Sequence, residues 1–222
     1  IQRNIDATRK SFDLSDVKPT AFPANDSLTA ANLPDNQATI ENIRLWDPEI
    51  LRPAIRNLQA IAQYYNFSDV DVDRYPVGGD PRQVMVSVRE VDPNGLADEA
   101  KTWQNLHLAY THGYGMVAVQ VNTAVSGGQP DFIVKEFNLK DAAIEVDQPR
   151  VYFGEPPPNA PEFVVANSAQ GEYDAPSLGG EGETTSFFNY DGSGGVRLSD
   201  IGRRLAFALR FRDVNLLISG NI

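Results

Sequence analysis

Both histidines of the chain lie within a stretch that carries no formal charge, residues 103–121. The side chains there that could do chemistry are His107, Tyr110, His112 and Tyr114. Imidazole can ligate a metal and can act as a general acid or base. His107 and His112 are five residues apart, so on one continuous helix their rings would not share a face as an i, i+4 pair does. Only a turn between them would let both reach one site.

A metal site built on these histidines needs at least one further ligand. Asp71 or Asp73 could supply a carboxylate, which would give a metal-assisted or acid–base hydrolase using His107 and His112. In the other interpretation each histidine is a hydrogen-bonded structural residue between a helix and a strand. We favour the structural interpretation, because the chain has no HExxH-like spacing. We expect no cofactor.

A second candidate is the row Asp69, Asp71 and Asp73. Strand alternation places these carboxylates on one face, about 7 Å apart, where they repel each other unless a cation or an arginine lies between them. The likeness to a calcium-binding EF-hand loop fails, because Arg74 occupies the sixth place, where that loop needs glycine. The pattern predicts a solvated strand face, partly neutralised by Arg74 and Arg82.

Composition excludes several classes of function. The chain has 30 acidic and 19 basic side chains and a formal charge of -11, which argues against a nucleic-acid partner. It has no cysteine, which excludes a thiol nucleophile, a thiolate metal site and a disulfide. GxSxG, SxxK and phosphate-loop patterns are also missing, so the sequence does not indicate a nucleophilic hydrolase or a nucleotide-binding protein.

The elements that would position the histidines follow from the hydrophobic spacing. Residues 103–110 have helical spacing and residues 116–121 alternate as a strand does, with Gly113 and Gly115 at the join. We expect helices over 1–12, from Pro48 after an Asp47 cap, from an Asp92 or Asn94 cap into the central stretch, and after a Ser199 cap. We expect strands over 39–45, 64–77, 82–91, 132–137, 149–155 and 163–168.

With 15 prolines and 17 glycines, these elements predict an α+β fold. We expect one domain over residues 1–222, with a mixed, largely antiparallel sheet, flanking helices and long irregular loops. The helix that begins at Pro48 is expected to run as far as residue 61, with a break or a later restart at Pro53 as the alternative. Residues 170–195 are glycine-rich and acidic, and within them YDGSGG (190–195) predicts a flexible hairpin or an exposed loop.

The last helix carries an apolar stripe, so we expect it to be heavily packed. Its four arginines could pair with carboxylates of the domain or bind anionic lipid headgroups, and we favour internal pairing. They are Arg203, Arg204, Arg210 and Arg212.

Several segments resemble a known family. They are VDVDRY (70–75), QVMVSVRE (83–90), WQNLHLAYTHGYGMVAVQVN (103–122), PRVYFGE (149–155) and RRLAFALRFRDVNLLIS (203–219). In this order they resemble uncharacterised protein family 0182, which is seen chiefly in actinobacteria and cyanobacteria. The family's members resemble multi-pass membrane proteins in which a large extracytoplasmic region follows several transmembrane helices. The resemblance implies no activity and no catalytic residues.

The resemblance implies that this chain is an extracytoplasmic piece of a bacterial plasma-membrane protein. Its first residue, Ile1, fits a cut inside a longer chain, and the longest uncharged run, 102–129, is too polar to span a membrane. Its partners would be the transmembrane helices of its own full-length chain and an envelope protein or ligand, with an oligomer as a further expectation. We therefore expect a structural or ligand-binding role, with the hydrolase as the alternative.

Overall fold

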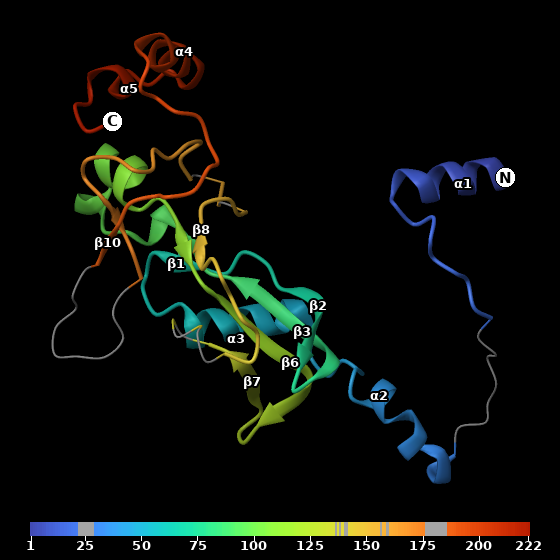
Figure 1. Ribbon diagram of the computed structural model, residues 1–222. Coiled ribbons are helices and arrows are strands. Elements are labelled where there is room, and N and C mark those ends of the chain that lie inside the picture. Colours follow the sequence, from blue (N-terminus) through green and yellow to red (C-terminus); the bar gives the residue numbers. More distant parts are fainter. Residues whose placement is uncertain are drawn as a thin grey trace. The chain divides into compact units, whose positions relative to one another are not determined.

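Residues 1–21, 29–135, 137, 139, 142–155, 157–158, 160–175 and 186–222 are described by the computed structural model (Figure 1). Their contacts divide the chain into two units, Ile1–Ile40 and Glu41–Ile222. Parts of residues 14–36, where three prolines predict an irregular surface segment, and of the glycine-rich stretch 170–195 lie outside the described residues. The α+β class is confirmed, and every strand pair that the structure describes is antiparallel. A single domain over residues 1–222 stays a prediction.

The first unit consists of short helices: α1 (Gln2–Ser11), η1 (Ala30–Asn32), η2 (Pro34–Asn36) and α2 (Gln37–Ile40). Helix α1 confirms the prediction for residues 1–12. None of these helices buries a residue. The strand expected over 39–45 is wrong. Its first residues end α2, and the backbone N–H groups of Leu45 and Trp46 share one acceptor, the carbonyl of Val121, so no ladder forms.

The second unit is built on a four-stranded sheet in the order β2-β3-β6-β7. Its strands are β2 (Asp71–Val77), β3 (Asp80–Val88), β6 (Met116–Val125) and β7 (Gln129–Val134). The hairpin β2–β3 confirms the predicted strand pair and turns through Gly78 and Gly79, both at positive φ. Glycine has no Cβ, so it adopts this backbone conformation without steric cost.

Helix α3 (Pro48–Gln59) covers one face of this sheet, as Figure 1 shows. The predicted Asp47 cap is confirmed, because its side chain accepts a hydrogen bond from the backbone N–H of Glu49. The helix continues through Pro53, so the alternative of a break or a later restart is wrong. Leu51 and Ile55, on either side of the proline, are fully buried against the sheet, and their burial outweighs the one backbone hydrogen bond that proline cannot donate.

The sheet has apolar side chains on both faces because successive strand residues point to opposite sides. Met85 and Val119 pack with α3 on one face. Val84 and Ala118 pack on the other, against Leu139 and its neighbours from the segment after β7. Both faces are therefore covered, and the sheet is a rigid base for the segments that leave its ends.

The central stretch is less regular than its spacing predicts. Asp92 caps η3 (Pro93–Gly95) as expected, but η4 (Asp98–Ala100) and η5 (Asn105–Ala109), a π-helical turn, replace one continuous helix. The chain then turns into β5 (Gly113–Tyr114). A Cβ atom on Gly113 would lie 1.9 Å from the carbonyl oxygen of Arg89, so only glycine fits this crossing of two backbones.

Short strand pairs extend the unit beyond the main sheet. They are β1 (Tyr65–Asn66) with β4 (Glu90–Val91), β5 with β8 (Arg150–Val151), and β9 (Glu172–Tyr173) with β10 (Phe187–Phe188). The last pair lies in the glycine-rich, acidic stretch 170–195, where no strand was predicted. The strand expected over 132–137 appears as β7, displaced to Gln129–Val134, and the strand expected over 149–155 appears in shortened form as β8. The strand expected over 163–168 does not form a ladder.

Helices α4 (Ile201–Phe211) and α5 (Asn215–Ile218) end the chain. Asp200, rather than Ser199, caps α4, because its carboxylate accepts from the backbone N–H of Arg203. The heavy packing expected of α4 is wrong: Ala208 is buried, whereas Ile201 and Leu209 are each 70% exposed.

Internal pairing of the four arginines with carboxylates is also wrong for the described part of the chain. Arg203 donates to the backbone carbonyl of Arg197, and Arg204 donates to those of Leu198 and Ile222. These carbonyls lie outside the helices and have no partner in a helix, so they can accept hydrogen bonds from side chains. The two guanidinium groups therefore do not need a carboxylate partner.

Candidate functional site

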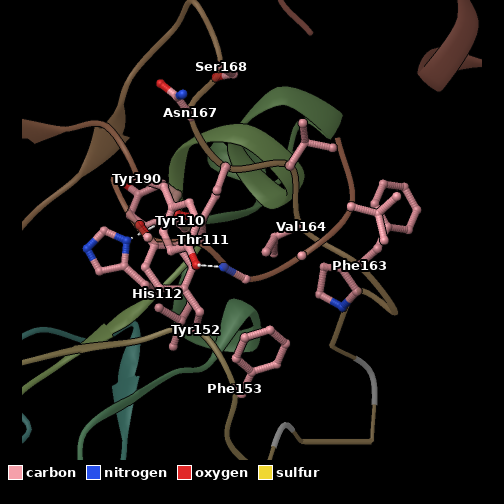
Figure 2. A pocket seen from close by; sticks show the side chains of 18 of the residues that line it. Tyr110, Thr111, His112, Tyr152, Phe153, Phe163, Val164, Asn167, Ser168 and Tyr190 are labelled. Carbon is pink, nitrogen blue, oxygen red and sulfur yellow. Dashed lines mark hydrogen bonds between the residues drawn. The ribbon is translucent and has the colours of Figure 1, made fainter. Parts of the chain in front are cut away.

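A large open pocket of about 1140 Å3 lies beside the central stretch. Figure 2 shows His112, Tyr152 and Tyr190 gathered on one side of it, and Phe163 and Val164 on another. Most of the lining comes from residues 110–113, 151–154, 160–168 and 192–199. These segments are irregular, so side-chain hydrogen bonds must hold the wall where a ladder does not.

Glu172 is the centre of those hydrogen bonds and is fully buried. Its Oε2 accepts from the hydroxyls of Thr111 and Tyr152, and its Oε1 accepts from the backbone N–H groups of Asn167 and Tyr190. Four donors take up essentially all the acceptor capacity of a carboxylate. Glu172 therefore joins four segments of the wall and has no free lone pair for proton transfer.

His112 lies next to this carboxylate and is 3% exposed. Its Nδ1 is 3.1 Å from the Thr111 hydroxyl oxygen. Because that hydroxyl donates its hydrogen to Glu172, it accepts from Nδ1–H, which places a proton on Nδ1. Nε2 lies 3.6 Å from Asp174 Oδ1. This is an ion-pair distance, longer than a hydrogen bond.

Asp174 is held by Arg150 through two parallel hydrogen bonds, 3.1 Å from Nε and 2.7 Å from Nη2. The guanidinium group of Arg150 also lies over the ring of Phe188, 3.6 Å from its centroid. A bidentate pair stacked on an aromatic ring has one defined geometry. Arg150 therefore fixes the carboxylate that faces His112.

The charges of this network stabilise one another. Burial alone would raise the pKa values of Glu172 and Asp174, but their hydrogen bonds and the neighbouring His112 lower both to about 2. Burial alone would lower the pKa of His112, but the two carboxylates raise it above its usual 6.5. Burial and the bond to Glu172 raise the pKa of Tyr152. Near pH 6, two carboxylates face an imidazolium and a guanidinium, and Tyr152 is neutral.

The two histidines should give opposite dependences of stability on pH. The pKa of His112 is raised in the folded state, so its stabilisation is complete below about 6.5 and is lost as pH rises through the folded value. Burial lowers the pKa of His107, so its contribution is present above 6.5 and is lost as pH falls. We expect His112→Gln to flatten the alkaline side of a urea-unfolding profile and His107→Gln to flatten the acidic side. The same change in both variants would contradict this assignment.

His107 is separate from the His112 network. Its ring stacks on Phe163, with centroids 4.3 Å apart, and lies 5.1 Å from the ring of Trp103. Nδ1 donates a hydrogen bond of 2.9 Å to the carbonyl oxygen of Phe163. His107 thus links the π-helical turn to the wall segment 160–168.

The remaining predicted site residues do not all share one site. Tyr110 lines the pocket and contacts the rings of Tyr64 and Tyr173. The guanidinium group of Arg150 lies over the Tyr114 ring, 5.7 Å from its centroid, and the carbonyl oxygen of Tyr114 accepts from Arg89. Asp71 and Asp73 are exposed on β2, as expected of a solvated strand face, but Arg82 pairs with Glu41 rather than neutralising them. Within the described ranges, no three His, Asp or Glu side chains lie close enough together to hold a metal.

Sequence reasoning missed the residues that join the wall together. Tyr152 and Arg150 lie in the PRVYFGE segment, which the sequence predicts as a strand and which carries part of the family resemblance, but which offers no sign of a site. Glu172 and Asp174 lie in the glycine-rich, acidic stretch 170–195, for which no strand and no site were predicted. One signal was present in the sequence: in EYD, carboxylates alternate around an aromatic residue, which is a strand pattern within a glycine-rich segment.

The comparisons with known proteins place the chain in a family. The sequence profile described as "Uncharacterised protein family (UPF0182)" matches residues 1–222. Similar proteins are UPF0182 proteins of Moorella thermoacetica, at 41% identity, and of Clostridium acetobutylicum and Pelotomaculum thermopropionicum, at 40% each. Each comparison covers 100% of this chain and 24% of the relative. These relatives come from Firmicutes, so an actinobacterial origin stays a prediction.

No solved structure matches the chain. In the part that the structure describes, no helix has the length and apolar character needed to cross a membrane. The match of the family profile over the full 222 residues, together with relatives at about 40% identity, decides the assignment. This chain belongs to the uncharacterised protein family UPF0182.

Proposed function

We propose that this chain is part of the extracytoplasmic region of a bacterial plasma-membrane protein and that its pocket binds a ligand or an envelope protein. The observation that carries the binding role is the braced pocket of about 1140 Å3. Its wall is fixed by a carboxylate that already accepts four hydrogen bonds, so the network provides rigidity rather than a reactive group. Rigid walls lower the entropy cost of binding.

The proposed location draws on the family resemblance and on the chain's share of its relatives. The chain spans 24% of the relatives' length, and the proposed transmembrane helices belong to the part that it does not span. A formal charge of -11 would keep such a region away from anionic lipid headgroups and available to an envelope partner.

The structure disfavours the hydrolase that would use both histidines. His107 is stacked on Phe163, and Nδ1 of His112 is engaged with Thr111. Asp71 and Asp73 lie on the exposed surface of β2. A general base must reach a proton of the substrate while the other catalytic groups contact the same substrate. The two histidines and the two aspartates do not lie together in one site, so they do not meet this requirement.

Cysteine labelling tests the location, because residues 1–222 contain no cysteine. Ser126→Cys would place a thiol in the exposed turn between β6 and β7 of a full-length protein that is freed of any other cysteine. We expect a membrane-impermeant maleimide to label it in intact cells. Val119→Cys, at a fully buried position, is the matched control and should react only after denaturation. Labelling of Ser126→Cys only in permeabilised cells would refute the extracytoplasmic location.

A further inference from the structure

In the described part of the chain, residues 163–167 of the wall segment 162–168 are bonded to the domain along one edge, and the carbonyl of Ser168 accepts from the backbone N–H of Gly171 in the turn that follows. The carbonyl of Phe163 accepts from His107 Nδ1 at 2.9 Å, and the backbone N–H of Val165 donates to the carbonyl of His107 at 2.7 Å. The N–H of Asn167 donates to Glu172. All three bonds come from odd-numbered residues. In an extended chain, peptide groups of alternate residues point to opposite sides, so this regular spacing marks one strand edge.

The opposite edge belongs to Val164 and Ala166. Among the described residues, neither has a partner for its backbone N–H or C=O group. Both residues line the pocket, and Val164 is 37% exposed. Phe, Val and Val at 163–165 are strong strand formers, yet no ladder includes them. The segment thus has the composition and one bonded edge of a strand, but lacks a neighbouring strand.

We propose that this free edge binds one extended polypeptide segment, which adds a strand through backbone hydrogen bonds to Val164 and Ala166. This inference rests on the proposed function and specifies the class of partner. In strand addition, main-chain hydrogen bonds provide the affinity, and pockets for alternate side chains of the added segment provide the specificity. The pocket offers apolar contacts for those side chains, since Phe153 is 84% exposed and Val196 is 59% exposed.

The shape of the site favours a single extended segment over a second folded copy. Val164 and Ala166, which carry the free edge, line a pocket that residues 192–199 also line. In a second folded copy the same edge would also belong to a pocket wall, so it could not reach this edge. A single extended peptide segment can enter the pocket.

A peptide with the sequence EFVVANS, copied from residues 162–168, is the probe, because antiparallel pairing would set its Val and Ala residues opposite Ala166 and Val164. We would add it to the full-length protein in detergent micelles and follow amide hydrogen exchange at single-residue resolution. We expect the amides of Val164 and Ala166 to become protected about 10-fold or more, as for amides that gain a ladder hydrogen bond. A peptide N-methylated at the pairing residues should not protect them.

The variant Val164→Pro removes the free N–H and leaves the bonded edge intact, so binding of a fluorescent EFVVANS peptide should weaken about 10-fold or more. Val164→Ala keeps the N–H and is the matched control. Equal affinity for the N-methylated peptide, or no binding up to about 1 mM, would overturn the proposal. If, without any peptide, the protection of the Val164 and Ala166 amides rises with protein concentration, the edge pairs with a second copy, and this result would also overturn the proposal. The peptide experiments do not depend on the cysteine labelling. Failure of strand addition would therefore leave the proposed extracytoplasmic location to its own test.

Discussion

Replacing Glu172 by alanine is expected to lower the free energy of unfolding by about 3 to 5 kcal/mol, the range for removing one partner of a buried charge pair. The change would leave the hydroxyls of Thr111 and Tyr152 and two backbone N–H groups without an acceptor. It would also remove one of the two carboxylates that stabilise the charge of His112. Urea unfolding of the 222-residue chain at pH 7 measures the loss.

The matched control for this prediction is Glu162→Ala, an exposed carboxylate in the same pocket lining, which should change stability by less than about 0.5 kcal/mol. Glu172→Gln tests the charge. Since the folded pKa of Glu172 is lowered to about 2, its stabilisation is present above about 4.5 and is lost as pH falls toward 2. Glu172→Gln should lose less stability on acidification than the wild-type chain. Equal losses for Glu162→Ala and Glu172→Ala would refute the role of the network.

Arg89→Ala should be comparably destabilising, by about 3 to 5 kcal/mol, the range for truncating a large buried side chain. Arg89 is fully buried, and it donates to the carbonyl of Gln59 at 3.0 Å and to that of Tyr114 at 2.8 Å. Its guanidinium group lies over the rings of Phe67 and Phe137, at 5.3 and 4.6 Å from their centroids. The substitution would open a cavity and remove the guanidinium donor from both carbonyls, which thermal melting and urea unfolding will detect.

Arg74→Ala, on the exposed side of β2, controls for the loss of one positive charge and should change stability by less than about 0.5 kcal/mol. Arg89→Lys should recover only part of the loss, because an ammonium group lacks the fixed fork that reaches both carbonyls. Burial lowers the pKa of Arg89 to about 10, so the folded chain bears a desolvation cost at this position. A stability of Arg89→Ala equal to that of Arg74→Ala would exclude the bracing role.

The elements that the sequence predicts well are those fixed by neighbouring residues. The hairpin β2–β3 follows from alternation on either side of two glycines, and α3 follows from Asp47 and Pro48 at its start. Even there, the sequence leaves a break at Pro53 open as an alternative, because it does not reveal how deeply Leu51 and Ile55 are buried. The exposed stripe of α4 shows the same difficulty: apolar spacing predicts a face, but not what covers it.

The site itself was only half predictable. His112 stood out because histidine is rare in this chain, but its partners Glu172 and Asp174 follow 60 and more residues later in a stretch typical of a loop. No local pattern records that Thr111 will donate to Glu172. His107 was grouped with His112 by proximity in sequence, and the π-helical turn between them sends the two rings to different partners.

The distances in sequence that Glu172 bridges have a consequence for the order of folding. Its donors lie 61, 20, 5 and 18 residues away, whereas β2 and β3 are joined by a turn of two glycines. Closing a long loop costs more chain entropy than closing a short one, so the hairpins should form before the wall. The wall that Glu172 joins to residue 111 is therefore expected to close after the hairpins, so occupancy of the pocket would report on a late step of folding.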